Sequence, residues 1–358
     1  MSLSTKSELQ EVRDGVEIEL TQFMRDQSAF LRSISAELEP VSAALSSFLL
    51  DSGKRLRPLF AYAGIVSAGG TLTPSTTKAI SCLELLQACA LIHDDLMDGS
   101  DTRRGKPSIH RHFESIHVQE ELEGFAPAYG LASAVLLGDL ALVWSNQLLN
   151  TSGISSQELH RVLPIFDEMR VELMAGQFLD IHEQTQKATD LSRSMKIARY
   201  KSGKYTIERP LHMGAVLAKD ASPELLGALS DYGLPLGEAF QFRDDLLGVF
   251  GDPSITGKPT GDDLREGKRT VLIAMTDAKS TPAMREESRK YFGKNGIDEK
   301  GVSIMQELIA STGAKTQLEL MIDELTDKAI EAIENPTIDS TARDLLNELA
   351  LIATKRSM

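Results

Sequence analysis

Apolar residues recur every three to four positions along most of the 358-residue chain, the spacing of amphipathic helices. The alternation typical of strands is almost absent, and the polar segments 99–108 and 251–269 are expected to be loops. Helices are predicted over residues 7–48 (divided at Pro40), 57–68, 74–93, 126–149, 156–186, 191–218, 223–250, 271–276, 283–292, 302–333 and 341–355.

No linker or fixed-period repeat divides the chain, which favours one all-α domain over two. We therefore expect a single domain over 1–358. Within it, 1–50 holds N-terminal helices for packing or dimerisation, 51–270 carries the motifs described below, and 271–358 holds C-terminal helices.

The net charge of −14 argues against non-specific binding of nucleic acid, which needs a basic surface. An anionic substrate would have to meet a local basic cluster or a bound metal. Two cysteines, Cys82 and Cys89, form no disulfide framework and suggest a reducing cytoplasm. We expect neither a secretory signal nor a transmembrane segment.

Two acidic motifs follow apolar helical stretches. Asp94 and Asp98 are four residues apart and share a helix face, with Asp95 adjacent. Asp244 and Asp245 follow the apolar stretch 234–242, and we expect them at the end of that helix. One such motif alone is equally typical of a solvated helix end. Two of them in one helical domain favour oxygen ligands for Mg²⁺ shared with phosphate groups.

Basic residues accompany both motifs. Arg103 and Arg104 follow the first, Lys258 and the pair Lys268-Arg269 follow the second, and Gly53-Lys54-Arg55-Leu56-Arg57-Pro58 opens another apolar helix. Positive charge at a helix N-terminus is unfavourable unless an anion joins it there. Carboxylates for metal and cations for phosphate oxygens together indicate a diphosphate site.

In order along the chain, these motifs resemble those of trans-polyprenyl diphosphate synthases, over roughly residues 53–269. They are Gly53-Lys54-Arg55-x-Arg57-Pro58, Asp94-Asp95-x-x-Asp98, Arg103-Arg104-Gly105, Gly176-Gln177-x-x-Asp180 and Gln241-x-x-Asp244-Asp245. The resemblance implies the all-α isoprenoid synthase fold with a deep central cavity, a homodimer and three Mg²⁺ ions per site. It implies the condensation of isopentenyl diphosphate with dimethylallyl, geranyl or farnesyl diphosphate, in a member most like geranylgeranyl diphosphate synthases.

The resemblance also assigns roles by position. Metal ligands would be Asp94, Asp95, Asp98, Asp244 and Asp245. The allylic diphosphate would meet Arg103, Gln177, Lys201, Lys258 and Lys268. Isopentenyl diphosphate would meet Lys54, Arg57, Gln87 and Arg104. Catalysis would use Lys201, Ser202 and Gln241 with Asp94 and Asp244, and released diphosphate is the candidate base.

The chain departs from the family pattern at three positions. Gly248 stands where the second motif usually has its last aspartate, and the next aspartate is Asp252. Gln87 stands where many members have His, and Ser202 where they have Thr; both keep a hydrogen-bonding group. We expect the further pair Asp262-Asp263 to order its loop by pairing with Lys258 or Lys268.

The floor under the growing product is predicted from helix geometry. One helical turn rises about 5.4 Å, so Cys89 and Ala90 would lie one turn below Asp94, and Leu86 one turn further. Small residues at 89 and 90 favour a C20 product over C15, although both could simply be core residues. Further walls are expected from Leu136, Leu140, Trp144 and Phe178.

Three alternatives stay open: a longer-chain synthase, a terpene cyclase of the same fold, and a non-catalytic subunit of a heteromeric synthase. A cyclase takes one diphosphate and has no use for Lys54, Arg57 and Arg104. A non-catalytic subunit commonly loses its aspartate motifs, whereas this chain keeps the first one intact.

Overall fold

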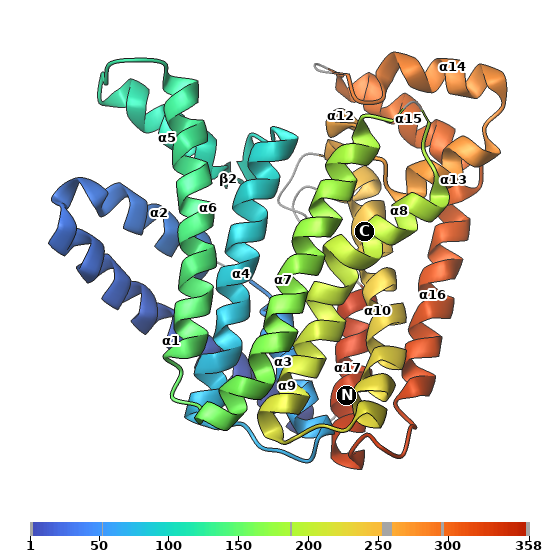
Figure 1. Ribbon diagram of the computed structural model, residues 1–358. Coiled ribbons are helices and arrows are strands. Elements are labelled where there is room, and N and C mark those ends of the chain that lie inside the picture. Colours follow the sequence, from blue (N-terminus) through green and yellow to red (C-terminus); the bar gives the residue numbers. More distant parts are fainter. Residues whose placement is uncertain (1–2, 52, 187, 253–259, 295–296, 356–358) are drawn as a thin grey trace.

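The computed structural model describes residues 3–355 except 52, 187, 253–259 and 295–296. The described chain is built almost wholly from helices, as predicted, and most of them run roughly side by side (Figure 1). The elements are α1 (Leu3–Ile34), η1 (Ala36–Leu38), α2 (Glu39–Leu50), α3 (Leu56–Ser67), α4 (Pro74–Asp98), β1 (Thr102–Arg103), β2 (Lys106–Pro107), α5 (Ile109–Gln119), α6 (Ala126–Asn150), α7 (Ser156–Gln184), α8 (Leu191–Ile197), the π-helical η2 (Ala198–Glu208), α9 (Arg209–Ala218), α10 (Pro223–Phe250), α12 (Asp262–Glu266), α13 (Val271–Lys279), α14 (Pro282–Tyr291), α15 (Glu299–Ser311), α16 (Ala314–Ala332), η3 (Ser340–Ala342) and α17 (Arg343–Thr354).

Several predicted boundaries coincide with the structure because the local signals are strong. Thr73 caps α4 with its side chain and Pro74 takes the first turn, where a missing N–H costs nothing. Gly99 ends that helix in the left-handed conformation, with φ of 68°. Pro40 lies in the first turn of α2, so the predicted division of the N-terminal stretch is confirmed.

Four expectations about secondary structure are wrong. The predicted helix 302–333 is divided at Gly313, whose φ of 74° ends one helix and begins the next. The loop 99–108 contains a small antiparallel hairpin that pairs Thr102 with Pro107. Helix α5 was not predicted, and the loop 251–269 contains the short helix α12.

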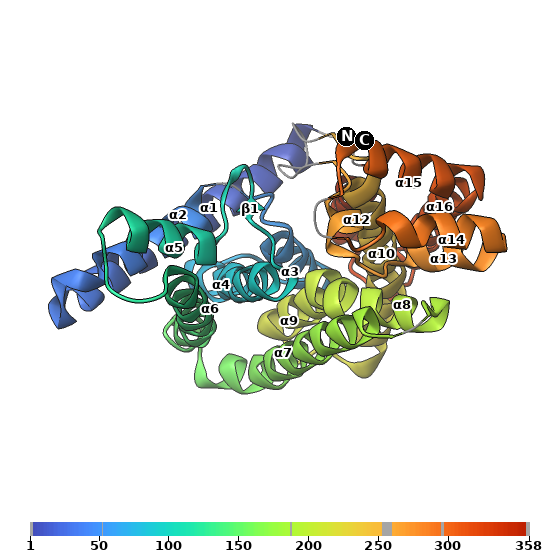
Figure 2. The ribbon, with the colours of Figure 1, turned by 90° about the horizontal axis from the view of Figure 1, so that it is seen from above.

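The helices are arranged around the ends of α4 and α10. Seen from above, α4, α5 and α6 lie on one side with the α1–α2 pair, and α10 and α12 to α16 lie on the other (Figure 2). Helices α3, α7, α9 and η2 lie between these two groups. Helices α4 and α10, which carry the two aspartate motifs, therefore belong to opposite groups.

The N-terminal helices pack on the main core. Val16 and Leu20 of α1 are fully buried, and α1 extends away from the bundle as one arm of a hairpin with α2 (Figure 1).

Helix α6 is unusual among the described helices. It is the one of them that is long and apolar enough to cross a membrane by length and composition, and only 28% of its most apolar window is buried within the chain. Leu131, Leu136 and Val143 are more than half exposed. On α7, the apolar side chains of Val171 and Phe178 are each 68% exposed.

Candidate active site

A cavity of about 810 Å³ opens between α3, α4, α7, η2, α10 and α12. Fourteen of the residues predicted from the sequence line it: Lys54, Arg57, Gln87, Ala90, Asp94, Arg103, Arg104, Gln177, Lys201, Ser202, Gln241, Asp244, Asp245 and Lys268. The structure therefore gathers groups that are up to 214 positions apart in the sequence. Lys258 lies outside the described residues.

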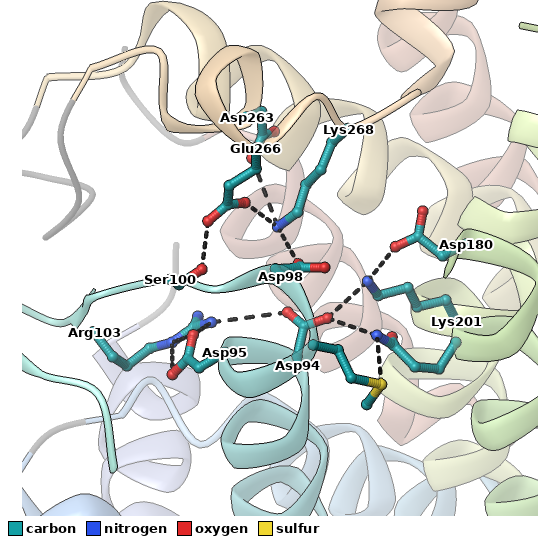
Figure 3. A network of polar contacts seen from close by, with 12 residues as sticks. Asp94, Asp95, Asp98, Ser100, Arg103, Asp180, Lys201, Asp263, Glu266 and Lys268 are labelled. Atoms are coloured by element: carbon teal, nitrogen blue, oxygen red, sulfur yellow. Dashed lines mark hydrogen bonds and ion pairs between the residues drawn. The ribbon is translucent and has the colours of Figure 1, made fainter. Parts of the chain in front are cut away.

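On the α4 wall, the Asp94 carboxylate accepts hydrogen bonds from two other elements. Gln177 of α7 donates from Nε2 at 3.0 Å, and Lys201 of η2 donates from Nζ at 2.8 Å. Lys201 also contacts Asp180 of α7 at 2.5 Å (Figure 3). This lysine therefore joins the first aspartate motif to the Gly176-Gln177-x-x-Asp180 motif.

Asp95 and Asp98 are buried beside the cavity, each against its own cation. The Arg103 Nε donates to both Asp95 oxygens at 3.0 Å, and the Asp95 side chain is only 1% exposed. Lys268 lies 2.9 Å from Asp98 Oδ2 and 2.8 Å from Glu266. Asp95 thus orients Arg103, and Asp98 meets Lys268, which the resemblance assigns to the allylic diphosphate (Figure 3).

The cations decide the charge of the α4 wall. Burial would raise the pKa of Asp94, but Lys201, Lys268 and Arg103 outweigh burial and hold the pKa of this carboxyl well below its usual value. Burial likewise opposes the charge on Lys201, yet Asp94 and Asp180 raise the pKa of its ammonium group. Asp94 is therefore a carboxylate and Lys201 an ammonium ion at neutral pH.

On the α10 wall, the helix continues past the aspartates to Phe250, so the expectation that they stand at a helix end is wrong. Asp245 accepts hydrogen bonds from Gln241 Nε2 at 2.8 Å and from the backbone N–H of Val271 at 3.2 Å. Burial, together with the Asp263 and Asp244 carboxylates, raises the pKa of Asp245 to about 8 despite these bonds.

The two arginines at the start of α3 have different surroundings. Arg55 is buried, adopts a left-handed backbone with φ of 50°, and is held by Glu84 and Glu17, each at 2.7 Å. Arg57 lies over the Tyr205 ring, 4.0 Å from its centroid, and donates to Thr206 at 2.8 Å. The Nε of Arg57 is buried and has no hydrogen-bond acceptor among the described residues, which suits an anionic ligand.

The remaining residues predicted for isopentenyl diphosphate, Lys54, Gln87 and Arg104, also line the cavity, and Lys54 is exposed. Arg104 also has a left-handed backbone, with φ of 53°, and its guanidinium donates to the Phe48 carbonyl at 3.1 Å. Two non-glycine residues in this strained region flank the basic cluster, each at a cost of roughly 1–2 kcal/mol.

Helix η2 delivers Lys201 and Ser202 to the cavity through π-helical backbone, a local distortion that is frequent at functional sites. The element approaches α7 closely at Gly176, where a Cβ atom would lie 2.6 Å from the Lys201 Cα. The glycine of the Gly176-Gln177 motif is thus required for the contact between Lys201 and Asp180.

The tail end of the cavity is only partly as expected. Ala90 lines it, whereas Cys89 and Leu86 are fully buried in the core; the Cys89 Sγ lies 3.8 Å from His93 Nδ1. The residues expected to form further walls do not line the cavity of a single chain: Leu136 is 66% and Phe178 is 68% exposed. Trp144 packs against Phe23, and Leu140 is partly buried against the core without lining the cavity.

Mg²⁺ fits the chemistry of these walls. Among the described residues no three acidic, His or Cys side chains are gathered tightly enough to hold a metal ion alone. However, Asp98 Oδ1 is buried and accepts no hydrogen bond from them, and the carboxylates of two walls face one cavity. Such a site suits a hard cation that shares its coordination with a bound diphosphate.

Sequence reasoning missed four residues that shape the site. Asp180 holds Lys201, Tyr205 and Thr206 hold Arg57, and Glu84 holds Arg55. The motif containing Asp180 was a usable signal. For Glu84, Tyr205 and Thr206 the only signal is a polar position on an otherwise apolar helix face, which does not name a partner.

Comparison with known proteins agrees with this geometry. A family model described as polyprenyl synthetase matches residues 39–309. The geranylfarnesyl diphosphate synthase of Aeropyrum pernix is 29% identical over 86% of this chain and 92% of its own, and the geranylgeranyl diphosphate synthase of Sulfolobus acidocaldarius is 32% identical over 78% and 77%.

A similar solved structure is a geranylgeranyl pyrophosphate synthase from Corynebacterium glutamicum, complexed with isoprenyl diphosphate and magnesium. It has a TM-score of 0.93 and 41% identity, and the match covers 98% of this chain and 99% of that one. The matched region contains every motif discussed above, and the fold is the same throughout. The chain therefore belongs to the polyprenyl synthetase family of prenyltransferases.

Proposed function

We propose that this protein condenses isopentenyl diphosphate with allylic diphosphates in a Mg²⁺-dependent reaction and releases mainly the C20 product, geranylgeranyl diphosphate. The observation that carries the proposal is the single cavity that joins two acidic walls to two separate groups of cations. A reaction between two diphosphates needs both groups, because each substrate brings its own charge.

The two substrates would bind on different sides of the cavity. Arg103, Gln177, Lys201 and Lys268 face the acidic walls and would hold the allylic diphosphate, with Lys258 as a further candidate. Lys54, Arg57, Gln87 and Arg104 would hold isopentenyl diphosphate.

Asp94, Asp98 and Asp244 are the residues that would hold Mg²⁺, three ions per site by analogy with the family, with Asp95 and Asp245 beside them. When bound, Mg²⁺ neutralises the charge that builds up on the leaving diphosphate. The ion pairs of Lys201 with Asp94 and of Lys268 with Asp98 would open so that both partners can turn to the substrate.

The chain's own residues would then stabilise and protect the allylic cation. The Gln241 amide and the Lys201–Ser202 backbone and hydroxyl present fixed dipoles to the cavity. The isopentenyl double bond attacks the cation, and the released diphosphate accepts the proton. Water has to be excluded, because it would convert the cation to an alcohol.

The length of the prenyl product would follow from the depth of the cavity below Asp94. The small side chain of Ala90 leaves that depth open to a tail longer than C15. Relatives named for C15, C20 and C25 products all match this chain, so the C20 assignment depends on Ala90 and the residues beneath it.

We also propose a cytoplasmic homodimer. The exposed apolar side chains of α6 and α7, such as Leu136, Val143 and Phe178, form a face that a second copy would cover. Large apolar side chains that are exposed in one chain are what an interface with a second copy would cover.

The testing experiment measures product length directly. The purified protein receives Mg²⁺, labelled isopentenyl diphosphate and each allylic starter in turn, and the products are dephosphorylated and chromatographed. A dominant C20 alcohol is expected. A C30 or longer product would overturn the length assignment, and no incorporation from any starter would overturn the enzymatic proposal.

Arg57→Gln tests the second diphosphate site against a cyclase that takes one substrate. The variant should raise the KM for isopentenyl diphosphate by roughly 10- to 100-fold with little change in the KM for farnesyl diphosphate, because a charged hydrogen bond contributes about 1.5–3 kcal/mol. Steady-state kinetics in both substrates checks this. An equal rise in both KM values would contradict separate sites.

A further inference from the structure

The α10 wall contains a glycine where the motif of its family has a third carboxylate. Gly248 lies one turn after Asp244 on the same helix and lines the same cavity. A glycine within a helix costs about 1 kcal/mol relative to alanine. Its presence at this position therefore calls for a local reason.

The space beside Gly248 is filled by the carboxylate of Asp263. A Cβ atom placed on Gly248 would lie well inside 3.0 Å of the Asp263 side chain, closer than such atoms approach in proteins. Asp263 comes from α12, fifteen positions further along the chain, and it too lines the cavity with Asp244 and Asp245. A carboxylate is thus present at this place on the wall, supplied by another helix.

The fold fixes the position of Asp263. Leu264, the next residue, is fully buried, and its carbonyl accepts a hydrogen bond from the Gly293 N–H at 2.9 Å. Gly261 and Gly267, with φ of 75° and 73°, begin and end α12, and the Lys268 N–H donates to the Asp263 carbonyl at 3.0 Å. Helix α12 therefore holds Asp263 against α10 independently of the side chain's charge.

Asp263 also faces the α4 wall. Lys268 Nζ lies 3.9 Å from Asp263 Oδ1 and 2.9 Å from Asp98 Oδ2, so this one ammonium group stands between the two walls (Figure 3). Asp98 is 2% exposed, and its Oδ1 accepts no hydrogen bond among the described residues. A buried carboxylate oxygen in this condition points to a cation at this place.

We propose that Asp263 supplies the carboxylate that Gly248 lacks, and that it faces the metal-bound diphosphate together with Asp244. Gly248 leaves the room that the Asp263 carboxylate occupies, and a side chain there would have to push that carboxylate aside. The inference rests on the proposed function, since it concerns the same metal and diphosphate. It differs from a loop-ordering role, in which Asp263 serves only as a partner for Lys268.

The test measures binding of Mn²⁺ in the presence of inorganic diphosphate by titration calorimetry on the full chain. Asp263→Asn, which keeps the shape of the side chain, should weaken this binding by roughly 10- to 100-fold, the usual loss for a group that tunes a metal site. Asp262→Asn removes the same charge from the neighbouring residue, which also lines the cavity but does not lie on Gly248, and should change binding less than threefold.

Moving the carboxylate back to α10 gives the sharper comparison. Gly248→Asp should weaken Mn²⁺–diphosphate binding as Asp263→Asn does, because the two carboxylates collide. The double variant Gly248→Asp with Asp263→Ala should recover binding to within about threefold of the native protein. Thermal unfolding of each metal-free variant confirms that it is folded; Asp263→Asn alone decides the matter if Gly248→Asp fails to fold.

The inference is overturned if Asp263→Asn binds as tightly as the native protein, or if Asp262→Asn is equally impaired. It is also overturned if Gly248→Asp alone binds normally. These outcomes are separate from failure of the proposed function, in which the native protein would form no prenyl product in the assay described above whatever the pattern of metal binding.

Discussion

The two aspartate-bearing walls of the cavity have similar sequences but opposite electrostatic surroundings. On α4, each acidic side chain lies against a cation from another element: Lys201 from η2, Arg103 from β1 and Lys268 after α12. On α10, Asp245 is buried near the carboxylates of Asp244 and Asp263. The pKa of Asp94 is held well below its usual value, whereas the pKa of Asp245 rises to about 8.

This difference shows that an Asp-Asp pair does not set its own charge; the elements packed around it do. The α4 wall is charged and balanced by the protein before any ligand binds. On the α10 wall, Asp245 is protonated at neutral pH until a cation arrives. On α4, replacing an aspartate by the neutral asparagine should therefore destabilise the metal-free protein. On α10, the same replacement should stabilise it.

Asp94→Asn should have the largest effect. Loss of a charged group at the departing diphosphate should lower kcat by roughly 10²- to 10³-fold. The metal-free protein should also lose stability, by up to about 3 kcal/mol, because the buried Lys201 loses one of its two carboxylate partners. Steady-state kinetics and urea unfolding in the presence of EDTA measure the two effects.

Two further substitutions separate these two effects. Asp94→Asn combined with Lys201→Met and Asp180→Asn removes the lysine together with both of its carboxylate partners, so stability should recover while activity stays low. If the triple variant is less stable than Asp94→Asn alone, the ion pairs do not account for the loss and the comparison between the walls fails.

The α4 wall should also set product length, and Ala90→Phe tests this one turn below Asp94. Ala90 lines the cavity, so a phenyl ring there should shorten the main product by one or more C5 units without abolishing turnover. Cys89→Ser is the matched control, because Cys89 is fully buried beside His93 and does not line the cavity. Chromatography of the dephosphorylated products gives both distributions. An unchanged product from Ala90→Phe would place the floor elsewhere.

Helix bounds could be predicted where a capping residue, a proline or a glycine marks them in the sequence. The bounds of α10 were predicted to the residue, because Ser222 caps the helix and Pro223 begins it. The division at Gly313 was missed, although Thr312-Gly313 carries a helix-stop signal, because the apolar spacing continues on both sides. The expectation that Asp244 and Asp245 stand at a helix end was wrong, because α10 continues beyond them to Phe250, where Gly251 caps it.

The candidate site could be predicted as a set of residues but not as a set of pairs. Motif order brought fourteen residues to one cavity, yet the partners that decide their charge come from packing. Asp180 against Lys201 and Asp263 against Gly248 depend on how α7 and α12 dock. The rotation of α6 and α7 likewise decides that Leu136 and Phe178 face outward, and periodicity alone does not fix that rotation.

Asp245→Asn should have the smallest effect and gives the most direct test of the difference between the walls. A carboxyl with a pKa of about 8 in the folded chain and about 3.9 in the unfolded chain keeps its proton between these values only when folded. Folding then binds a proton, so the free energy of unfolding of the native protein falls as pH rises through this window, by up to about 1.4 kcal/mol per pH unit. Asparagine cannot titrate and lacks this slope.

The measurement is urea unfolding in EDTA at several values from pH 5 to pH 9, with the stability of Asp245→Asn relative to the native protein as the result. That relative stability should rise from pH 5 to about pH 8 and then level off. Asp94→Asn supplies the control, because Asp94 is ionised in both the folded and the unfolded chain over this range, so its effect on stability should not vary with pH. If both variants are equally insensitive to pH, the carboxylates around Asp245 do not hold a proton there. Any difference in charge between the aspartates of the α4 wall and those of the α10 wall would then have to come from bound metal alone.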